Sequence, residues 1–216
     1  MKLGRKRILI VDDHPVVREG LAERIGREPD LEVVAAAEDA ASAIDAVRRH
    51  APDMALVDIS LKSGSGLDLI KTLKIIRPKL RILVISMHDE SLYAKRAIRA
   101  GALGYVSKQE PMADILRAVR KVIAGEVAVS ENFTRAALLD LAGRRKHSKS
   151  APTEELSDRE LEILRLLGRG RSTRQIAGEL NISVKTVETY RLRIKKKLNI
   201  PTAAGLIRYA ARWIAD

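Results

Sequence analysis

The chain has 216 residues, 46% of them hydrophobic and 31% charged, with no cysteine and a formal net charge of +12. Without cysteine there is no disulfide, thiolate nucleophile or cysteine-ligated zinc, and the four histidines are too scattered for a motif-spaced metal site. Strongly apolar runs such as Ile8–Val11 are four residues long, whereas a membrane helix needs roughly 18 or more apolar residues. We therefore expect a cytoplasmic protein that does not contact a membrane.

Short aliphatic and β-branched runs in the first part of the chain are separated by stretches with helical spacing of apolar residues. The runs predict strands at Arg7–Asp12, Leu31–Ala36, Met54–Asp58, Arg81–Ser86 and Tyr105–Ser107. The spacing predicts helices at Val16–Ile25, Ala40–Val47, Leu67–Ile76, Leu92–Ala100 and Ile115–Ile123. Because apolar strands that alternate with amphipathic helices are typical of a parallel sheet covered on both faces, residues 1–125 are predicted to form an α/β domain with a doubly wound, parallel five-stranded sheet.

The pattern changes after Gly125. Residues 126–153 are interpreted as a linker, because Gly143–Pro152 is polar and basic, and a short helix is expected at Asn132–Leu141. Residues 154–216 show helical periodicity alone and are predicted to form a small all-α domain. Its helices are expected at Ser157–Leu167, Thr173–Leu180, Val184–Leu198 and Thr202–Ile214. The expected N-caps are Ser157, Ser172 and Ser183. Ser157 forms a capping box with Glu160.

The positive charge is concentrated in the last third of the chain. Residues 142–216 contain 17 Lys and Arg against 8 Asp and Glu, a net charge of +9, whereas residues 1–141 have a net charge of +3. Such a local excess indicates contact with a polyanion, usually nucleic acid. Composition alone is equally compatible with a solubilising surface, so the residue pattern has to decide.

Polar side chains stand at the ends of four predicted strands: Asp12, Asp13, Asp58, Ser86 and Lys108. In an open parallel sheet, functional groups gather beyond the carboxyl ends of the strands. Carboxylates suit Mg²⁺, a lysine and a serine hydroxyl can hold a phosphoryl group, and an aspartate can act as the nucleophile. Each residue taken singly is more often a helix cap or a solvated side chain. Their joint placement indicates a phosphoryl-handling site.

The strand-end residues lie in four segments within residues 7–123, which are ILIVDDHPVVREGL, DMALVDISLKSGSGLDLI, ILVISMHD and AGALGYVSK. In these segments the first part of the chain resembles the receiver domains of two-component response regulators. The resemblance implies a flavodoxin-like fold in which a histidine kinase phosphorylates Asp58. It also implies a Mg²⁺ ion held by Asp12, Asp13, Asp58 and the backbone carbonyl of Ser60. Ser86 and Lys108 would grip the phosphoryl group, and Ser86 and Tyr105 would form the conformational switch.

The last part of the chain has the pattern of a helix-turn-helix module. The segment RSTRQIAGELNISVKTVETYRLRIKKKLNI predicts a short helix whose apolar residues Ile176, Ala177 and Leu180 face the core. A turn is predicted at Asn181–Ser183, before a longer helix. The apolar positions of the longer helix are Val187, Tyr190, Leu192, Ile194 and Leu198.

Residues 155–214 resemble the DNA-binding domain of LuxR-type regulators, the NarL/FixJ group. The resemblance implies that Val184–Leu198 enters the major groove, and that the final helix is partly core and partly dimer surface. The candidates for base contact are Glu188, Thr189 and Arg193. The candidates for phosphate contact are Lys185, Thr186, Arg191, Lys195 and Lys196.

Together these features predict a phosphorylation-controlled transcription regulator rather than an enzyme. Its expected partners are a sensor histidine kinase, double-stranded promoter DNA and, when phosphorylated, a second copy of the chain, with RNA polymerase as a further candidate. One alternative is a phosphorylation-independent DNA-binding protein whose receiver serves protein interaction alone. The other is an aspartate-nucleophile phosphohydrolase, which generally needs a second acid two residues after the nucleophile, where this chain has Ser60.

Overall fold

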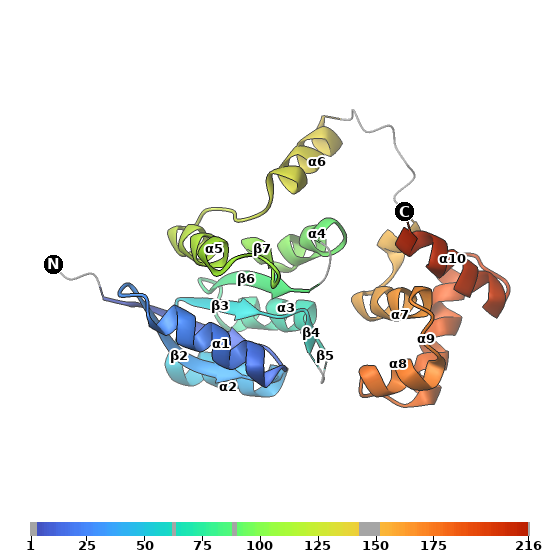
Figure 1. Ribbon diagram of the computed structural model, residues 1–216, viewed down its shortest axis with the longest axis horizontal. Coiled ribbons are helices and arrows are strands. Elements are labelled where there is room, and N and C mark those ends of the chain that lie inside the picture. The colour runs from blue at the N-terminus through green and yellow to red at the C-terminus, as the bar shows by residue number, and fades with distance from the viewer. Residues whose placement is uncertain (1–3, 62–63, 88–89, 143–151, 216) are drawn as a thin grey trace. The chain divides into compact units, whose positions relative to one another are not determined.

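The structure is a computed structural model that describes residues 4–61, 64–87, 90–142 and 152–215. The chain divides into two compact units, Met1–Leu141 and Ala142–Asp216, and each is described by itself (Figure 1). Most of the predicted linker segment Gly143–Pro152 lies outside the described residues, and Pro152 itself opens a short 3₁₀ helix, η1 (Pro152–Glu155). Within the described ranges, no helix has the length and apolar character needed to cross a membrane.

A parallel five-stranded sheet forms the centre of the first unit, with strand order β2-β1-β3-β6-β7. Its strands are β1 (Lys6–Val11), β2 (Leu31–Ala37), β3 (Met54–Val57), β6 (Arg81–Ser86) and β7 (Gly104–Ser107). All neighbouring pairs are parallel, which confirms the predicted doubly wound architecture. Because the strand order reverses between β1 and β3, the crevice in which such sheets bind ligands opens at the carboxyl ends of these two strands.

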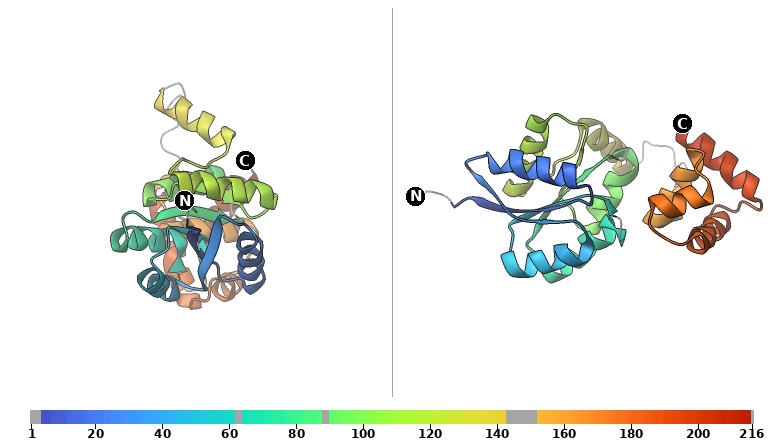
Figure 2. Two further views of the ribbon diagram at one scale, coloured as in Figure 1. Left: turned by 90° about the vertical axis from the view of Figure 1, so that its left-hand side faces the viewer. Right: turned by 60° about the horizontal axis from the view of Figure 1, so that its bottom comes forward.

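Helices cover both faces of the sheet. α1 (Pro15–Gly26) and α5 (Met112–Ala124) lie on one face, and α2 (Ala40–His50) and α3 (Gly66–Ile76) lie on the other (Figure 2). α4 (Glu90–Ala100) packs against α3 and β7. The residues of Ile8–Val11 all have 0% exposure, because successive side chains of a strand point to opposite faces and both faces are covered.

A small antiparallel pair, β4 (Ser60–Leu61) with β5 (Gly64–Ser65), connects β3 to α3 and was not predicted. Two-residue strands are too short to leave a periodic signal. The backbone N–H of Gly66 donates to the carbonyl of Ile59 at 2.8 Å. A Cβ at position 66 would lie 2.0 Å from the carbonyl oxygen of Asp58, so the residue that opens α3 must be glycine for the chain to approach Asp58 this closely.

After α5 the chain turns at Gly125, in the left-handed region at φ 90°, and runs beside the edge strand β7. It then forms α6 (Glu131–Leu141), which begins one residue before the predicted short helix and packs against α4. The stretch that was predicted as linker therefore includes residues that belong to the first unit by their contacts.

The described part of the second unit, residues 152–215, is helical, as predicted. It contains η1, α7 (Asp158–Gly168), α8 (Thr173–Glu179), α9 (Val184–Lys197) and α10 (Ala203–Ala215). The predicted N-caps Ser157, Ser172 and Ser183 each accept a hydrogen bond from the backbone of the first turn. α7 and α10 cross closely at Gly168, where a Cβ would lie 2.5 Å from the carbonyl oxygen of Ala210.

Candidate functional site

The structure brings the predicted carboxylates together at the carboxyl edge of the sheet. Asp12 and Asp13 follow β1, Asp58 follows the neighbouring strand β3, and all three are buried, with 0%, 7% and 2% exposure. Asp58 was predicted as the last strand residue, but β3 ends at Val57. Ser86 ends β6 and is buried, and its carbonyl accepts the backbone N–H of Lys108 at 2.9 Å.

Lys108 bridges two of these carboxylates. Its Nζ lies 2.7 Å from Oδ2 of Asp58 and 2.5 Å from Oδ2 of Asp12, and its side chain is only 7% exposed. Burial raises the pKa of Asp58, because the charged form is desolvated, and the Lys108 charge opposes this shift. Burial alone would lower the pKa of Lys108, but Asp58 and Asp12 raise it above its usual value. Lys108 therefore keeps its positive charge at the candidate phosphoryl site.

The residue types and spacing of the pocket fit a divalent cation. Asp12, Asp13 and Asp58 each offer an oxygen, and together with a nitrogen of His14 these atoms all lie within 4.8 Å of one another. Carboxylate oxygens are preferred ligands of Mg²⁺. The backbone N–H of Ser60 donates to Oδ1 of Asp58 at 3.3 Å, which holds the acidic side chain in place.

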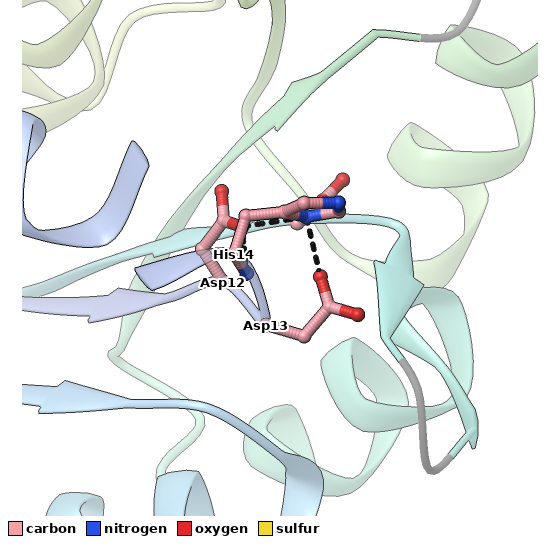
Figure 3. Close-up of side chains that lie close together, drawn as sticks. Asp12, Asp13 and His14 are labelled. Carbon is pink, nitrogen blue, oxygen red and sulfur yellow. Dashed lines mark hydrogen bonds and ion pairs between the residues drawn. The ribbon is translucent and has the colours of Figure 1, made fainter. Parts of the chain in front are cut away.

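Two residues near the carboxylates were not among the predicted site residues. Nδ1 of His14 lies 2.7 Å from Oδ1 of Asp13, and the imidazole faces the acidic pair (Figure 3). Nη1 of Arg18 donates to the carbonyl of Asp12 at 2.6 Å. The available signals were the position of His14 directly after the acidic pair and that of Arg18 one helical turn later.

The expected switch residues are both buried. Ser86 is 1% exposed and Tyr105, in the middle of β7, is 3% exposed. In the register of the sheet, Tyr105 is paired with Val84 and Ser86 with Ser107. Tyr105 therefore lies on the strand directly paired with that of Ser86, and its side chain is buried.

The exposed face of α9 carries most of the predicted DNA-contact residues. Val187 and Ile194 are buried and anchor the helix. The exposed side chains on the opposite side are Lys185, Glu188, Thr189, Leu192, Arg193 and Lys196. Leu192 was grouped with the apolar positions of the helix, but it is 64% exposed. It lies five residues after Val187, which places it about 140° around the helix from that buried side chain.

Three of the predicted DNA contacts, Arg193 of the exposed face among them, also contact neighbours within the second unit. Nη1 of Arg191 donates to Oγ1 of Thr173 at 2.5 Å, and the side chain of Arg191 is half-buried. The backbone N–H of Thr186 donates to Oγ of Ser183 at 3.0 Å. The guanidinium of Arg193 lies 5.8 Å from the ring centroid of Tyr190. Arg191 thus joins α9 to the start of α8, a role that its helix position alone does not reveal.

Family models match both units. The model of the response regulator receiver domain matches residues 8–120, and that of the bacterial regulatory proteins of the luxR family matches residues 154–210. The chain therefore belongs to the two-component response regulators with a LuxR-type helix-turn-helix DNA-binding domain. This family consists of transcription regulators and not of enzymes, so the phosphohydrolase alternative is dropped.

Curated relatives align with this chain over nearly their whole length. The oxygen regulatory protein NreC of Staphylococcus carnosus is 36% identical over 211 residues, which cover 95% of this chain and 97% of NreC. NreC of Staphylococcus haemolyticus is 38% identical over 212 residues with the same coverage. Among solved structures, RcsB of Salmonella enterica serovar Typhimurium, bound to promoter rprA in the presence of the phosphomimetic BeF₃⁻, has a TM-score of 0.63. RcsB is 26% identical, with 96% of this chain and 99% of RcsB covered.

Proposed function

We propose that phosphoryl transfer to Asp58 controls the binding of promoter DNA by α9, and that a sensor histidine kinase supplies the phosphoryl group. The observation that carries this proposal is the Asp58 carboxylate, which is buried, held 2.7 Å from the Lys108 ammonium and grouped with Asp12 and Asp13. A cation and a cluster of carboxylates around one buried aspartate are suited to an anionic group that arrives at that aspartate.

In the proposed reaction, a carboxylate oxygen of Asp58 attacks the phosphorus of a phosphohistidine. The new O–P bond forms an acyl phosphate as the P–N bond breaks, and the kinase imidazole leaves with the electron pair of that bond. Lys108 already lies beside the acceptor and contacts the phosphoryl oxygens, and the Ser86 hydroxyl donates to one of them. The resulting shift of Ser86 and Tyr105 is the proposed conformational switch.

We assign Mg²⁺ as the cofactor. Asp12, Asp13, Asp58 and the backbone carbonyl of Ser60 would hold the ion, which would supply charge neutralisation for the phosphoryl oxygens when bound. The support is the set of carboxylate oxygens within 4.8 Å of one another.

The proposed DNA surface is the exposed face of α9. Glu188, Thr189 and Arg193 are assigned to base edges, and Lys185, Thr186, Arg191, Lys195 and Lys196 to phosphates. Leu192 lies within the same face and, being apolar, suits a thymine methyl group. Because RcsB dimers bind DNA, we propose that phosphorylation frees or reorients the second unit and promotes a homodimer that places two recognition helices on adjacent half-sites.

The accompanying domain assignment is a receiver at residues 1–125, a linker at 126–153, whose first part up to Leu141 packs with the receiver, and a DNA-binding domain at 154–216. A kinase partner and promoter DNA are both consistent with a cytoplasmic location.

The test is incubation with acetyl phosphate and Mg²⁺, followed by intact mass, size-exclusion elution and DNA affinity, for the wild type and Asp58→Asn. We expect one added phosphoryl group, a shift toward dimer and a gain in DNA affinity of roughly 5–150-fold, all lost in the variant. Beryllofluoride serves as a second activator in the same assays. If both activators leave elution and DNA affinity unchanged, the alternative of a phosphorylation-independent DNA-binding regulator is favoured.

A further inference from the structure

His14 stands at the mouth of the acidic pocket, at the N-cap position of α1. Its backbone N–H donates to Oδ1 of Asp12 at 2.9 Å. Its Nδ1 lies 2.7 Å from Oδ1 of Asp13 and 3.4 Å from Oδ1 of Asp12 (Figure 3). The His14 side chain is 63% exposed, whereas both carboxylates are buried, so the imidazole is reached from solvent before the carboxylates are.

These distances match the ligand spacing around a single small cation. With metal–ligand bonds of about 2.1 Å, neighbouring ligands of an octahedral ion lie about 3 Å apart and opposite ligands about 4.2 Å apart. The four residues of the cluster each place one ligand atom within 4.8 Å of the others. Small adjustments of the side chains would therefore bring His14, Asp13 and Asp58 into one coordination sphere.

We infer that His14 is a nitrogen ligand of the cation at this site and shifts its metal preference from Mg²⁺ toward first-row transition ions. Oxygen ligands suit Mg²⁺, whereas imidazole suits ions of the Zn²⁺ and Ni²⁺ class, so one imidazole among carboxylates selectively strengthens the binding of the second class. The lone pair of an unprotonated imidazole nitrogen forms the bond to the metal. This inference rests on the cation site of the proposed function.

The test is calorimetric titration with Co²⁺ and with Mg²⁺, together with the visible absorption of bound Co²⁺. The wild type is compared with His14→Gln and with the control His50→Gln, which changes a histidine at the far end of α2. We expect His14→Gln to weaken Co²⁺ binding about tenfold or more and to change the Co²⁺ spectrum, to weaken Mg²⁺ binding by a smaller factor, and the control to behave like the wild type.

Equal Co²⁺ affinity and spectra in the wild type and His14→Gln would overturn the inference, and His14 would then only donate a hydrogen bond to Asp13. The proposed function would still stand if Mg²⁺ binds. If neither ion binds the wild type, the proposal of a cation site at these carboxylates is contradicted.

Residues 126–130, which we call the return segment, follow α5 and pair with the edge strand β7. Their contacts support a second, independent inference. Ala128 donates its N–H to the carbonyl of Leu103 at 3.0 Å, and its own carbonyl accepts the N–H of Tyr105 at 2.8 Å. This close approach needs Gly104, where a Cβ would lie 2.5 Å from the Ala128 carbonyl oxygen. The return segment is thus hydrogen-bonded directly to the expected switch residue.

Ser130, the last residue of the return segment, is hydrogen-bonded to α4 and directly precedes α6. The N–H of Ser130 donates to Oε1 of Glu90, the first residue of α4, at 2.8 Å. Oγ of Ser130 accepts the N–H of Phe133 at 3.0 Å, and its carbonyl accepts the N–H of Thr134 at 3.0 Å. One residue therefore connects α4 to the first turn of α6.

We propose that the return segment transmits the state of the phosphorylation pocket to α6, the helix that precedes the second unit. This proposal also rests on the proposed function. The test compares Glu90→Ala with Glu90→Gln, which keeps an acceptor oxygen for the Ser130 amide. The readouts are hydrogen exchange of that amide and the ratio of DNA affinities with and without beryllofluoride.

We expect Glu90→Ala to lose protection of the Ser130 amide and to reduce the affinity ratio, and Glu90→Gln to retain both. Loss of protection with an unchanged ratio would overturn the proposal, as would full protection in Glu90→Ala. A wild-type ratio of one would instead contradict the proposed function.

Discussion

Nζ of Lys108 lies 2.7 Å from Oδ2 of Asp58, although the two residues are 50 positions apart in the chain. Removal of the ammonium leaves the buried carboxylates of Asp58 and Asp12 without their cation. We expect Lys108→Gln to destabilise the first unit by about 3–5 kcal/mol in the presence of EDTA, and Mg²⁺ to restore part of the loss. Hydrogen exchange of peptides covering β1 and β3 measures the effect.

The control for this variant is Lys71→Gln. Lys71 pairs with Asp68 at 2.8 Å, but the side chains are 57% and 70% exposed, so the change should cost less than about 1 kcal/mol. Equal protection of β1 and β3 in the two variants would show that the Lys108 contacts do not hold the pocket together.

Gly66 is expected to tolerate no side chain. Its Cβ would lie 2.0 Å from the carbonyl oxygen of Asp58 and 2.7 Å from Cα of Ile59, and backbone atoms cannot move aside cheaply. Gly66→Ala should cost at least about 3 kcal/mol and lower phosphorylation at Asp58, measured by hydrogen exchange and intact mass. The matched control is Gly20→Ala in α1, where a Cβ meets open space and should stabilise by about 0.5–1 kcal/mol. Wild-type behaviour of Gly66→Ala would contradict the described approach of α3 to Asp58.

Glu160 is expected to make the second unit pH-dependent. Burial opposes ionisation of this carboxyl, but hydrogen bonds from Lys197 at 2.6 Å and from the Ser157 N–H at 2.7 Å outweigh it and lower its pKa. Because the folded pKa is lowered, the stabilisation is present above the ordinary value of 4.5 and is lost as the pH falls from there through the folded pKa.

Glu160→Gln should therefore cost about 1–3 kcal/mol at neutral pH and much less at acidic pH. Trp213, in α10, is the single tryptophan of the chain, so its fluorescence during urea unfolding reports this unit within the full-length protein. A cost that does not change with pH would assign the effect to packing rather than to the charge.

The crossing of α7 and α10 depends on Gly168. A Cβ there would lie 2.4 Å from Cδ1 of Ile214 and 2.5 Å from the carbonyl oxygen of Ala210. Gly168→Ala should cost about 1–3 kcal/mol in the Trp213 unfolding transition. Gly178→Ala in α8, which meets open space, should be neutral or stabilising. If both variants unfold at the same urea concentration, the two helices must be able to separate without cost.

The five long strands and the α-helices of both units, but not the two-residue strands β4 and β5, could be read from the sequence, because local patterns determine them. Buried strands such as Met54–Val57 are continuous apolar runs, and the helices of the second unit begin at serines that cap them. The meeting of Asp12, Asp13 and Asp58 was also predictable, since carboxyl ends of neighbouring parallel strands share one edge of a sheet.

Other features were decided by the tertiary structure alone. The 2.7 Å contact of His14 with Asp13, the pairing of Ala128 with β7 and the bond from Arg191 to Thr173 depend on side-chain direction and on how distant segments pack. The exposure of Leu192 likewise depends on which stripe of α9 the neighbouring helices cover. Sequence periodicity describes which residues are apolar along one element, whereas distances between elements arise only when the whole chain has packed.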